Sequence, residues 1–492
     1  MASCVCREWA ALLASPQAWQ VIDLGQCDAT VAIKDSHLEV LCSRAARELR
    51  TLRLHPPAGG RLRPSTVVAV CAANRSLGEL DACQLRFPWS GLQVQAALDA
   101  CPDLSMRCDA YVTGEPTDST MSLLAALESR RLVCARLHVA GRLRGESLTL
   151  MGSTLLEGAR LHRLELAFAD VGDASIAVLA PGIAACGLRE LCLRGNSLTA
   201  VGATILTRAM ADSKCRLERL VLGSNNISDA GATRVARLLR DNTTLSALDL
   251  SGNGITAPGA VCLAASLTRN RTLTNLNLDF NAVGPTGAAA LAAALTHSGL
   301  VSLELEWNGI QDGGATTMAF ALHATPASTL RHLGLASNGI RAGGAILLAG
   351  ALRGSGLRSL VLAGNSLGIG ALALAAAVRS STQLRMLDVT SCGVGADAQL
   401  VFAASLAAPG SALTVLRLGG NNPGVSVLAP FAEALSTNAV LEELEFTMVV
   451  KDGDCPPAGA VDVTLRREPG GQGHWRGSPS SRYTALAHEA PL

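Results

Sequence analysis

The chain of 492 residues is poor in lysine, in aromatic residues and in net charge. Its only lysines are Lys34, Lys214 and Lys451, aromatic residues make up 3% of the chain, and the formal net charge is +1. A near-neutral chain has no overall field that draws nucleic acid or an acidic membrane surface to it. We therefore expect neither nucleic acid nor a membrane among its partners.

The sequence also lacks the short motifs that most often carry metal binding or catalysis. Its 15 cysteines include no C-x-x-C pair, no lysine stands in a G-x-x-x-x-G-K-[ST] phosphate loop, and no H-E-x-x-H zinc motif occurs. Residues 368–373 fit the G-x-G-x-x-A spacing of a dinucleotide site, but they lie where a repeated unit turns into its helix. We predict a non-enzymatic protein with reduced cysteines, no metal ion and no cofactor.

Targeting signals are absent from the opening of the chain, where no charged segment is followed by an apolar run. We expect the cytoplasm as its location, with the nucleus as the alternative. Residues 359–378 contain no charged side chain, a run long enough to span a membrane. Because this run keeps the phase of the repeat, a buried repeat explains it better.

What the chain does contain is one phrase, L-x-x-L-x-L-x-x-N-x-[LIV], written seven times between Leu188 and Asn365. Successive starts are 29, 28, 28, 27, 30 and 27 residues apart, and a glycine usually stands six residues after the Asn. Self-similarity at this period is the signature of a solenoid, in which each unit contacts only its neighbours. Eleven units open on leucines in this register: Leu161, Leu188, Leu217, Leu245, Leu273, Leu300, Leu330, Leu357, Leu384, Leu413 and Leu441.

Each unit reads as a strand, a turn and a helix. The Leu-x-Leu pair has the period of a strand with both leucines on one face, and the alanine-rich stretch 287–295 has helical spacing. Neighbouring strands lie about 4.8 Å apart, whereas packed helices need roughly 8–10 Å. The predicted fold is therefore an α/β leucine-rich-repeat solenoid, a horseshoe with a parallel inner β-sheet and outer helices.

The recurring Asn has a predicted structural role. Backbone groups that leave the strand lose their partners and must be satisfied in the turn. A carboxamide both donates and accepts hydrogen bonds, so a column of Asn side chains can join each turn to the next. We predict that these asparagines are structural.

The repeated pattern resembles the leucine-rich repeats of the ribonuclease-inhibitor class over residues 161–446. That class includes ribonuclease inhibitor, the Ran GTPase-activating proteins and the sensing repeats of NOD-like receptors. The resemblance implies a protein ligand on the concave face. Because one scaffold serves many partners, the resemblance predicts the fold but does not predict the function.

A second resemblance lies at the start of the chain. Residues 5–24 are similar to the second half of an F-box, whose phrase is close to VCRxWxxLxxxxxLWxxLDL; the matching residues are Val5, Cys6, Arg7, Trp9, Leu12, Trp19, Asp23 and Leu24. The family's leading half, with its Leu-Pro start and first helix, does not precede them here. The resemblance implies contact with the Skp adaptor of a cullin-type ubiquitin ligase. A short amphipathic helix that caps the first repeat is the alternative.

These patterns divide the chain into four expected segments. Residues 1–25 form a partial F-box-like cap, 26–160 form degenerate leading repeats (or a separate small domain), 161–451 form the regular repeats, and 452–492 form a mostly disordered tail. Within the tail, Val461, Val463 and Leu465 can form one last edge strand. We expect the whole chain to be a monomer.

The candidate binding residues are those that break the repeat. Strand parity places the residues that flank the strand leucines on the concave face, where negative charge concentrates in three units and two aromatic residues precede the Asn. A carboxylate cluster beside two stacked large rings is a candidate hot spot for a basic, arginine-bearing protein segment. In the alternative, the rings pack against the turns and the carboxylates are ordinary solvated groups. The predicted site comprises Asp249, Asn277, Asp279, Phe280, Glu304, Glu306 and Trp307.

Overall fold

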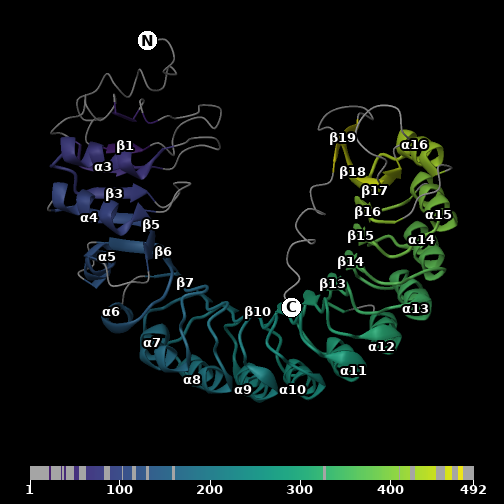
Figure 1. Ribbon diagram of the computed structural model, residues 1–492, viewed down its shortest axis with the longest axis horizontal. Helices are drawn as coiled ribbons and strands as arrows, with labels where there is room; N and C mark the ends of the chain where they lie inside the picture. The colour runs from purple at the N-terminus through teal and green to yellow at the C-terminus, as the bar shows by residue number, and fades with distance from the viewer. Residues whose placement is uncertain are drawn as a thin grey trace, which may run out of the picture. The chain divides into compact units, whose positions relative to one another are not determined.

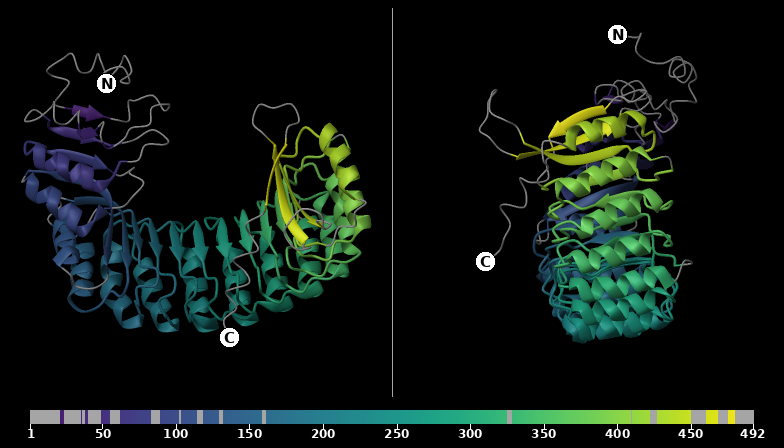
Figure 2. Two further views of the ribbon diagram at one scale, coloured as in Figure 1. Left: turned by 45° about the horizontal axis from the view of Figure 1, so that its top comes forward. Right: turned by 90° about the vertical axis from the view of Figure 1, so that its right-hand side faces the viewer.

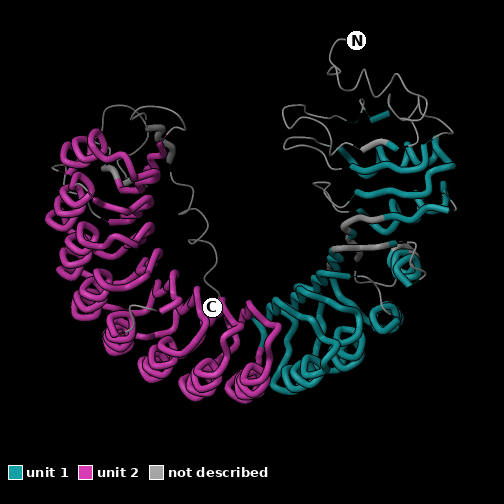
Figure 3. The backbone as a smooth tube through the Cα atoms, turned by 180° about the vertical axis from the view of Figure 1, so that it is seen from behind, with its two compact units in different colours: residues 1–225 teal, residues 226–492 magenta. Residues whose placement is uncertain are grey.

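A computed structural model describes most of the chain. The described residues are 21–23, 35, 38–39, 49–54, 62–82, 89–101, 103–113, 118–128, 132–157, 161–324, 328–408, 410–421, 427–449, 460–467 and 475–479. The chain divides into two compact units, residues 1–225 and 226–492 (Figure 3).

Unit 1 is a run of parallel strands that alternate with helices (Figure 1). Its strands are β1 (Val21–Asp23), β2 (Thr51–Arg53), β3 (Glu79–Ala82), β4 (Trp89–Ser90), β5 (Ser105–Thr113), β6 (Leu132–Ala140), β7 (Arg163–Glu165), β8 (Glu190–Cys192) and β9 (Arg219–Val221). Its helices are α3 (Pro64–Ala73), α4 (Gly91–Ala100), α5 (Asp118–Glu128), α6 (Gly145–Leu156), α7 (Asp173–Ala185) and α8 (Ala200–Met210). Every strand pair described within this unit is parallel.

The region 26–160, where the sequence repeat is blurred, has the same alternation of strand and helix. Its strands β5 and β6 are nine residues long, whereas β7 to β9 have three. The pairing of β5 with β6 also shifts register between Cys108 and Ala110. Longer strands and a register shift change the spacing of the leucines, which is why the repeat phrase is hard to read there.

Unit 2 has the regular form of the repeat, with strands on the inner face of its curve and helices outside (Figure 2). Its parallel strands are β10 (Ala247–Asp249), β11 (Asn275–Asn277), β12 (Ser302–Glu304), β13 (His332–Gly334), β14 (Ser359–Val361), β15 (Met386–Asp388), β16 (Val415–Leu418) and β17 (Glu443–Val449). Its helices are α9 (Ser228–Asp241), α10 (Ala257–Leu267), α11 (Gly284–Leu295), α12 (Gln311–Ala324), α13 (Ala342–Leu352), α14 (Gly370–Ser380), α15 (Ala396–Ala407) and α16 (Leu428–Thr437).

The predicted α/β solenoid is confirmed. From β7 to β17, each strand begins two residues after the leucine that opens its unit. The strand leucines are buried, as in Leu248, Leu276 and Leu303, which are at most 3% exposed. A glycine six residues after the Asn lets adjacent helices approach closely: a Cβ on Gly314 would lie 2.9 Å from the Ala288 Cβ.

The asparagine column is also confirmed as a bridge between turns. The Asn338 Oδ1 accepts hydrogen bonds from the backbone N–H groups of Asn308 and Ile310 in the preceding repeat, at 2.9 and 3.2 Å. Its Nδ2 donates to the carbonyls of Leu305 and Ala336 at 2.7 and 3.0 Å. At the ninth unit Cys392 replaces Asn and still donates its thiol to the Leu362 carbonyl at 3.0 Å.

A second kind of contact between neighbouring repeats was not predicted from the sequence. An aspartate in the first turn of one helix accepts hydrogen bonds from the start of the next helix. Asp229 accepts from the backbone N–H groups of Thr256 and Gly259 at 2.7 and 3.1 Å, and Asp312 accepts from those of Arg341 and Gly344 at 2.7 and 3.0 Å. These carboxylates satisfy N–H groups that have no partner within their own helix.

The C-terminal segment departs from the expected disorder. The predicted last strand is present as β18 (Ala460–Arg467), which pairs antiparallel with β17, and a further strand, β19 (Trp475–Pro479), pairs antiparallel with β18. The alternation of Val461, Val463 and Leu465 suits an edge strand, but β19 contains one glycine and one proline in five residues and gave no such signal. The rest of residues 452–492 lies outside the described residues. In the parts of the chain that are described, no helix is long and apolar enough to cross a membrane.

We predict that Asn338→Ala lowers the free energy of unfolding by about 3 kcal/mol, because it leaves several buried backbone groups without partners. Chemical denaturation followed by circular dichroism measures the change. Asn275→Ala is the matched control, because Asn275 is exposed and its side chain accepts one hydrogen bond, from the Thr274 hydroxyl. The control should lower the free energy of unfolding by less than about 0.5 kcal/mol. Equal decreases in the two variants would contradict a bridging role for Asn338.

Candidate functional site

The seven predicted site residues lie together on one face of β10, β11 and β12 and on the turns that follow. The strand pairing aligns Asp249 with Asn277, and Asn277 with Glu304. Asp279 and Glu306 come two residues later in their units, and Phe280 and Trp307 directly follow them. The repeat therefore brings together side chains that are up to 58 positions apart in the sequence.

Phe280 and Trp307 form a stacked pair at the surface. Their ring centroids are 6.2 Å apart with an interplanar angle of 13°. Phe280 is 60% exposed and Trp307 is 58% exposed, so the rings contact each other without being buried beneath the turns.

The backbone at these two positions is left-handed, with φ of 55° at Phe280 and 53° at Trp307. This conformation costs a non-glycine residue roughly 1–2 kcal/mol. The position before the Asn column has positive φ throughout unit 2, and elsewhere it holds glycine or serine: Gly252, Ser337, Gly364, Ser391 and Gly420. Large aromatic side chains at this position are therefore not required by the turn.

The carboxylates beside the rings are partly held by hydrogen bonds. Asp279 accepts from the Asn277 Nδ2 at 2.9 Å and from the backbone N–H of Glu306 at 2.7 Å. The backbone N–H of Ser251 donates to Asp249 at 2.8 Å. Asn277 is thus a positioning residue that orients the Asp279 carboxylate.

Crowding of these acids perturbs their protonation. Burial, reinforced by the charges of Asp279 and Glu304, raises the pKa of Glu306 to about 7. Burial also raises the pKa of Asp279 to about 6, against the opposing hydrogen bond from the backbone of Glu306. The face therefore carries its full negative charge only above neutral pH.

Two neighbours of the site were not among the predicted site residues. The His332 Nε2 lies 2.7 Å from the Glu304 Oε1, and this hydrogen bond raises the pKa of His332. A Cβ on Gly334 would lie 2.0 Å from the Glu304 Oε2, so the absence of a side chain there makes room for the carboxylate. Strand parity does place both residues on the concave face, because the pairing aligns Ser302 with His332 and Glu304 with Gly334, but the predicted site ended at β12.

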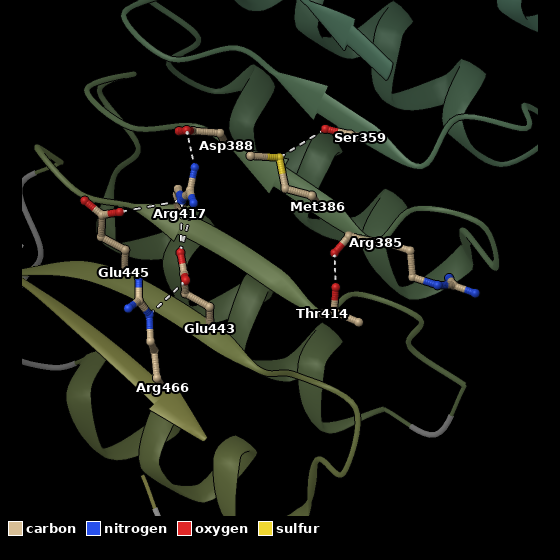
Figure 4. Close-up of polar contacts among 9 residues, drawn as sticks. All are labelled: Ser359, Arg385, Met386, Asp388, Thr414, Arg417, Glu443, Glu445 and Arg466. Atoms are coloured by element: carbon tan, nitrogen blue, oxygen red, sulfur yellow. Dashed lines mark hydrogen bonds and ion pairs between the residues drawn. The ribbon is translucent and has the colours of Figure 1, made fainter. Parts of the chain in front are cut away.

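A separate charge cluster lies at β15 to β18, where Arg417 is surrounded by three carboxylates (Figure 4). The Arg417 Nη2 donates to the Glu443 Oε1 at 3.0 Å. The Arg417 Nη1 lies 3.8 Å from the Asp388 Oδ2, and the Arg417 Nε lies 3.8 Å from the Glu445 Oε2. The Arg466 Nε, from β18, donates to the other oxygen of Glu443 at 3.1 Å. Burial raises the pKa of Glu443, but the bonds from the two arginines outweigh it and leave that pKa lowered. The charges of the Arg417 cluster thus pair with one another, and they join the antiparallel hairpin of β17 and β18 to the regular repeats.

The F-box-like residues Val5, Cys6, Arg7, Trp9, Leu12 and Trp19 lie outside the described residues. Strand β1, directly after them, pairs in parallel with β2.

One stretch, residues 364–368, fits the G-x-S-x-G spacing of a serine nucleophile. In the structure it is a repeat turn, in which the Asn365 Nδ2 donates to the carbonyls of Leu335 and Leu362 at 2.9 and 2.7 Å. The spacing is therefore accounted for by the asparagine column. Among the residues with described positions, no group of three or more His, Cys, Asp or Glu side chains is arranged to hold a metal ion.

Comparison with known proteins supports the repeat assignment. The family model described as "Leucine Rich repeat" matches residues 214–236, 241–264, 269–292, 299–319 and 327–349. The chain therefore contains leucine-rich repeats, and assignment to the ribonuclease-inhibitor class stays a prediction. No curated protein matches the chain.

Similar solved structures include leiomodin-1 actin-binding site 2, at 20% identity and a TM-score of 0.25, over 30% of this chain and 85% of that one. A TLR13–ssRNA13 complex is similar at 13% identity and a TM-score of 0.37, over 81% of this chain. In that case the match spans 62% of the other chain.

We predict that Glu306→Gln raises the melting temperature at pH 8 and that this gain shrinks as the pH falls through about 7. A carboxyl whose pKa is raised in the folded state takes up its proton there first, so the wild-type chain regains stability as the pH falls toward the unfolded pKa. Asp241→Asn controls for the change in net charge, because its side chain is 76% exposed. A gain from Glu306→Gln that is equal at pH 8 and pH 5 would contradict the buried charge.

Proposed function

We propose that this leucine-rich-repeat chain is a protein-interaction scaffold, and that the face of β10 to β12 binds a basic segment of a partner protein. The observation that carries the proposal is the exposed Phe280–Trp307 pair beside the carboxylates of Asp279, Glu304 and Glu306. We call these residues, with Asp249 and Asn277, the acidic–aromatic face.

The acidic–aromatic face has more negative charge than its own surroundings neutralise. His332 lies against Glu304, but within the described parts of the chain no Lys or Arg side chain forms an ion pair with Asp249, Asp279 or Glu306. The Arg417 cluster shows the contrast, because there the carboxylates have arginine partners. A bound Arg or Lys would supply the missing positive charge and restore full ionisation of Glu306 and Asp279.

The rings give that cation a second contact. A guanidinium is attracted to the face of Trp or Phe within about 6 Å of the ring centroid, and Arg also pairs with carboxylates in a planar, two-point geometry. Next to the acids, β13 presents Gly334 and, in its turn, Ala336. Neither residue projects beyond the strands, because Gly334 has no side chain and Ala336 is only 7% exposed.

In its finer form, the proposal is that the chain is the substrate-recognition subunit of a cullin-type ubiquitin ligase. Support for this role is the F-box-like sequence of residues 5–24, through which the Skp adaptor would bind while the repeats bind the substrate. The alternative is a repeat protein like a GTPase activator or a NOD-like receptor, which binds its protein ligand without any ligase.

We predict that peptides selected from a display library on the full-length chain are enriched in Arg or Lys, and that Phe280→Ser with Trp307→Ser weakens their binding at least about tenfold. Serine occupies the equivalent turn position at Ser337 and Ser391, so the double variant should fold. Fluorescence anisotropy measures the affinities. A second double variant, Trp307→Ala with Glu304→Ala, should abolish the same binding.

The matched control for the aromatic pair is Phe320→Ser. Phe320 is 61% exposed but lies on α12, away from the strands, so its loss should leave binding unchanged. Equal weakening by the control, or full binding by the Phe280/Trp307 variant, would contradict the proposal.

For the ligase role, we predict that the full-length chain co-precipitates the Skp adaptor and that Trp9→Ala with Leu12→Ala abolishes this capture. The display-selected peptides should still bind this variant. Lack of capture by the wild-type chain would contradict the ligase role without touching the acidic–aromatic face, and acceleration of GTP hydrolysis by a small GTPase would favour the alternative.

A further inference from the structure

A second charged surface of unit 2 lies at the opposite end of the strands, where the chain passes from each helix to the next strand. Five successive connections, taken over their described residues 268–274, 296–301, 324, 328–331, 353–358 and 380–385, contain no Asp or Glu. They contain the arginines Arg269, Arg271, Arg331, Arg353, Arg358 and Arg385. We call this surface the basic edge.

Three of these arginines are stacked directly on one another. The backbone N–H of Arg358 donates to the carbonyl of Arg331 at 2.8 Å, and that of Arg385 donates to the carbonyl of Arg358 at 2.7 Å. Adjacent strands lie about 4.8 Å apart, so three cations form one column. Like charges opposite each other on neighbouring strands are destabilising, which means that packing alone does not explain the column.

Across the described ranges, no carboxylate forms an ion pair with Arg331, Arg358 or Arg385. The Arg331 Nη1 donates to the carbonyls of Ser328 and Leu330 at 2.8 and 2.9 Å. The Arg385 Nη1 donates to the Thr382 carbonyl at 3.1 Å, and Figure 4 shows this side chain directed away from the Arg417 cluster.

Local structure explains only part of the basic edge. Arg353 follows the last residue of α13, where a cation stabilises the negative end of the helix dipole. Arg331, Arg358 and Arg385 stand instead at the entry to a strand. Because Arg331 and Arg385 use one nitrogen to fix the side chain and a guanidinium has five N–H donors, donors remain for a ligand.

We propose that the basic edge binds an acidic segment of a partner protein, whose carboxylates pair with Arg331, Arg358 and Arg385. Arginine favours carboxylates because its planar group pairs with both oxygens. Single-stranded nucleic acid is also anionic, but proteins that bind it add aromatic side chains on which the bases stack. The five connections contain no Phe, Tyr or Trp, which favours the acidic peptide.

The test is a binding titration of the full-length chain with two labelled probes, a poly-glutamate peptide and an oligo-deoxythymidine. Poly-glutamate should bind more tightly than the oligonucleotide, and the variant R331Q/R358Q/R385Q should lose at least about tenfold in affinity for it, since three charge contacts disappear together. Because Arg331 also holds the carbonyl of Ser328, R358Q/R385Q is measured as well and should keep the native melting temperature while losing most of the affinity.

The matched control is R234Q/R237Q/R341Q, which removes the same charge from exposed residues of unit 2 outside the five connections. Its affinity for poly-glutamate should stay within about twofold of wild type, because screened charges at a distance contribute little. Equal loss in the control, or no loss in R331Q/R358Q/R385Q, would overturn the proposal. Tighter binding of oligo-deoxythymidine that depends on the three arginines would overturn it in favour of a nucleic-acid surface. The peptides selected on the acidic–aromatic face should bind these variants normally.

Discussion

The regular repeats depend on the satisfaction of backbone hydrogen bonds in the turns that leave very short strands. Most strands of unit 2 have three residues, so the sheet ends before the chain has turned toward its helix. The Asn side chains take over at that point, and each joins its own turn to the preceding one, as Asn365 does for Asn338 and Ile340. With the backbone held in this way, the residue directly before the Asn can face outward in a left-handed conformation. The acidic–aromatic face is built on that position.

At the turns and strands of the repeat, some side chains are required for folding and others are free to contact a partner. At the left-handed position, glycine or serine is enough for folding, and Phe280 and Trp307 accept backbone strain that nothing in the turn demands. At the concave positions, the carboxylates of Asp279 and Glu306 are crowded enough that burial and mutual repulsion raise their pKa to about 6 and about 7. Backbone strain under two large exposed rings, together with crowded carboxylates beside them, is typical of a surface kept for binding.

Much of this was readable from the sequence because the repeat fixes both the register and the parity of the side chains. The leading leucines predicted every strand start from β7 to β17, and parity brought Asp249, Asn277 and Glu304 together. The predicted stacking of the two rings is also confirmed. The sequence did not predict the close approach of His332 to Glu304 or the aspartates that cap the following helix, because these depend on side-chain directions that a leucine pattern does not encode. Strand β19 was missed because Gly477 and Pro479 favour a loop locally, whereas pairing with β18 decides the outcome.

The antiparallel turn after β17 has a consequence for how such a chain can change in evolution. Parallel units can be duplicated or deleted anywhere in a run, because every unit offers its successor the same surface. Beyond β17 the direction of the chain reverses, and Arg466 on β18 is tied to Glu443 on β17. A copied repeat added after this point would meet a strand that runs in the opposite direction. The β17–β18 hairpin therefore prevents further parallel repeats from being added at this end of the run. Lengthening must occur by insertion within the run, and an insertion between β12 and β17 would shift the acidic–aromatic face relative to the β17–β18 hairpin by whole repeats.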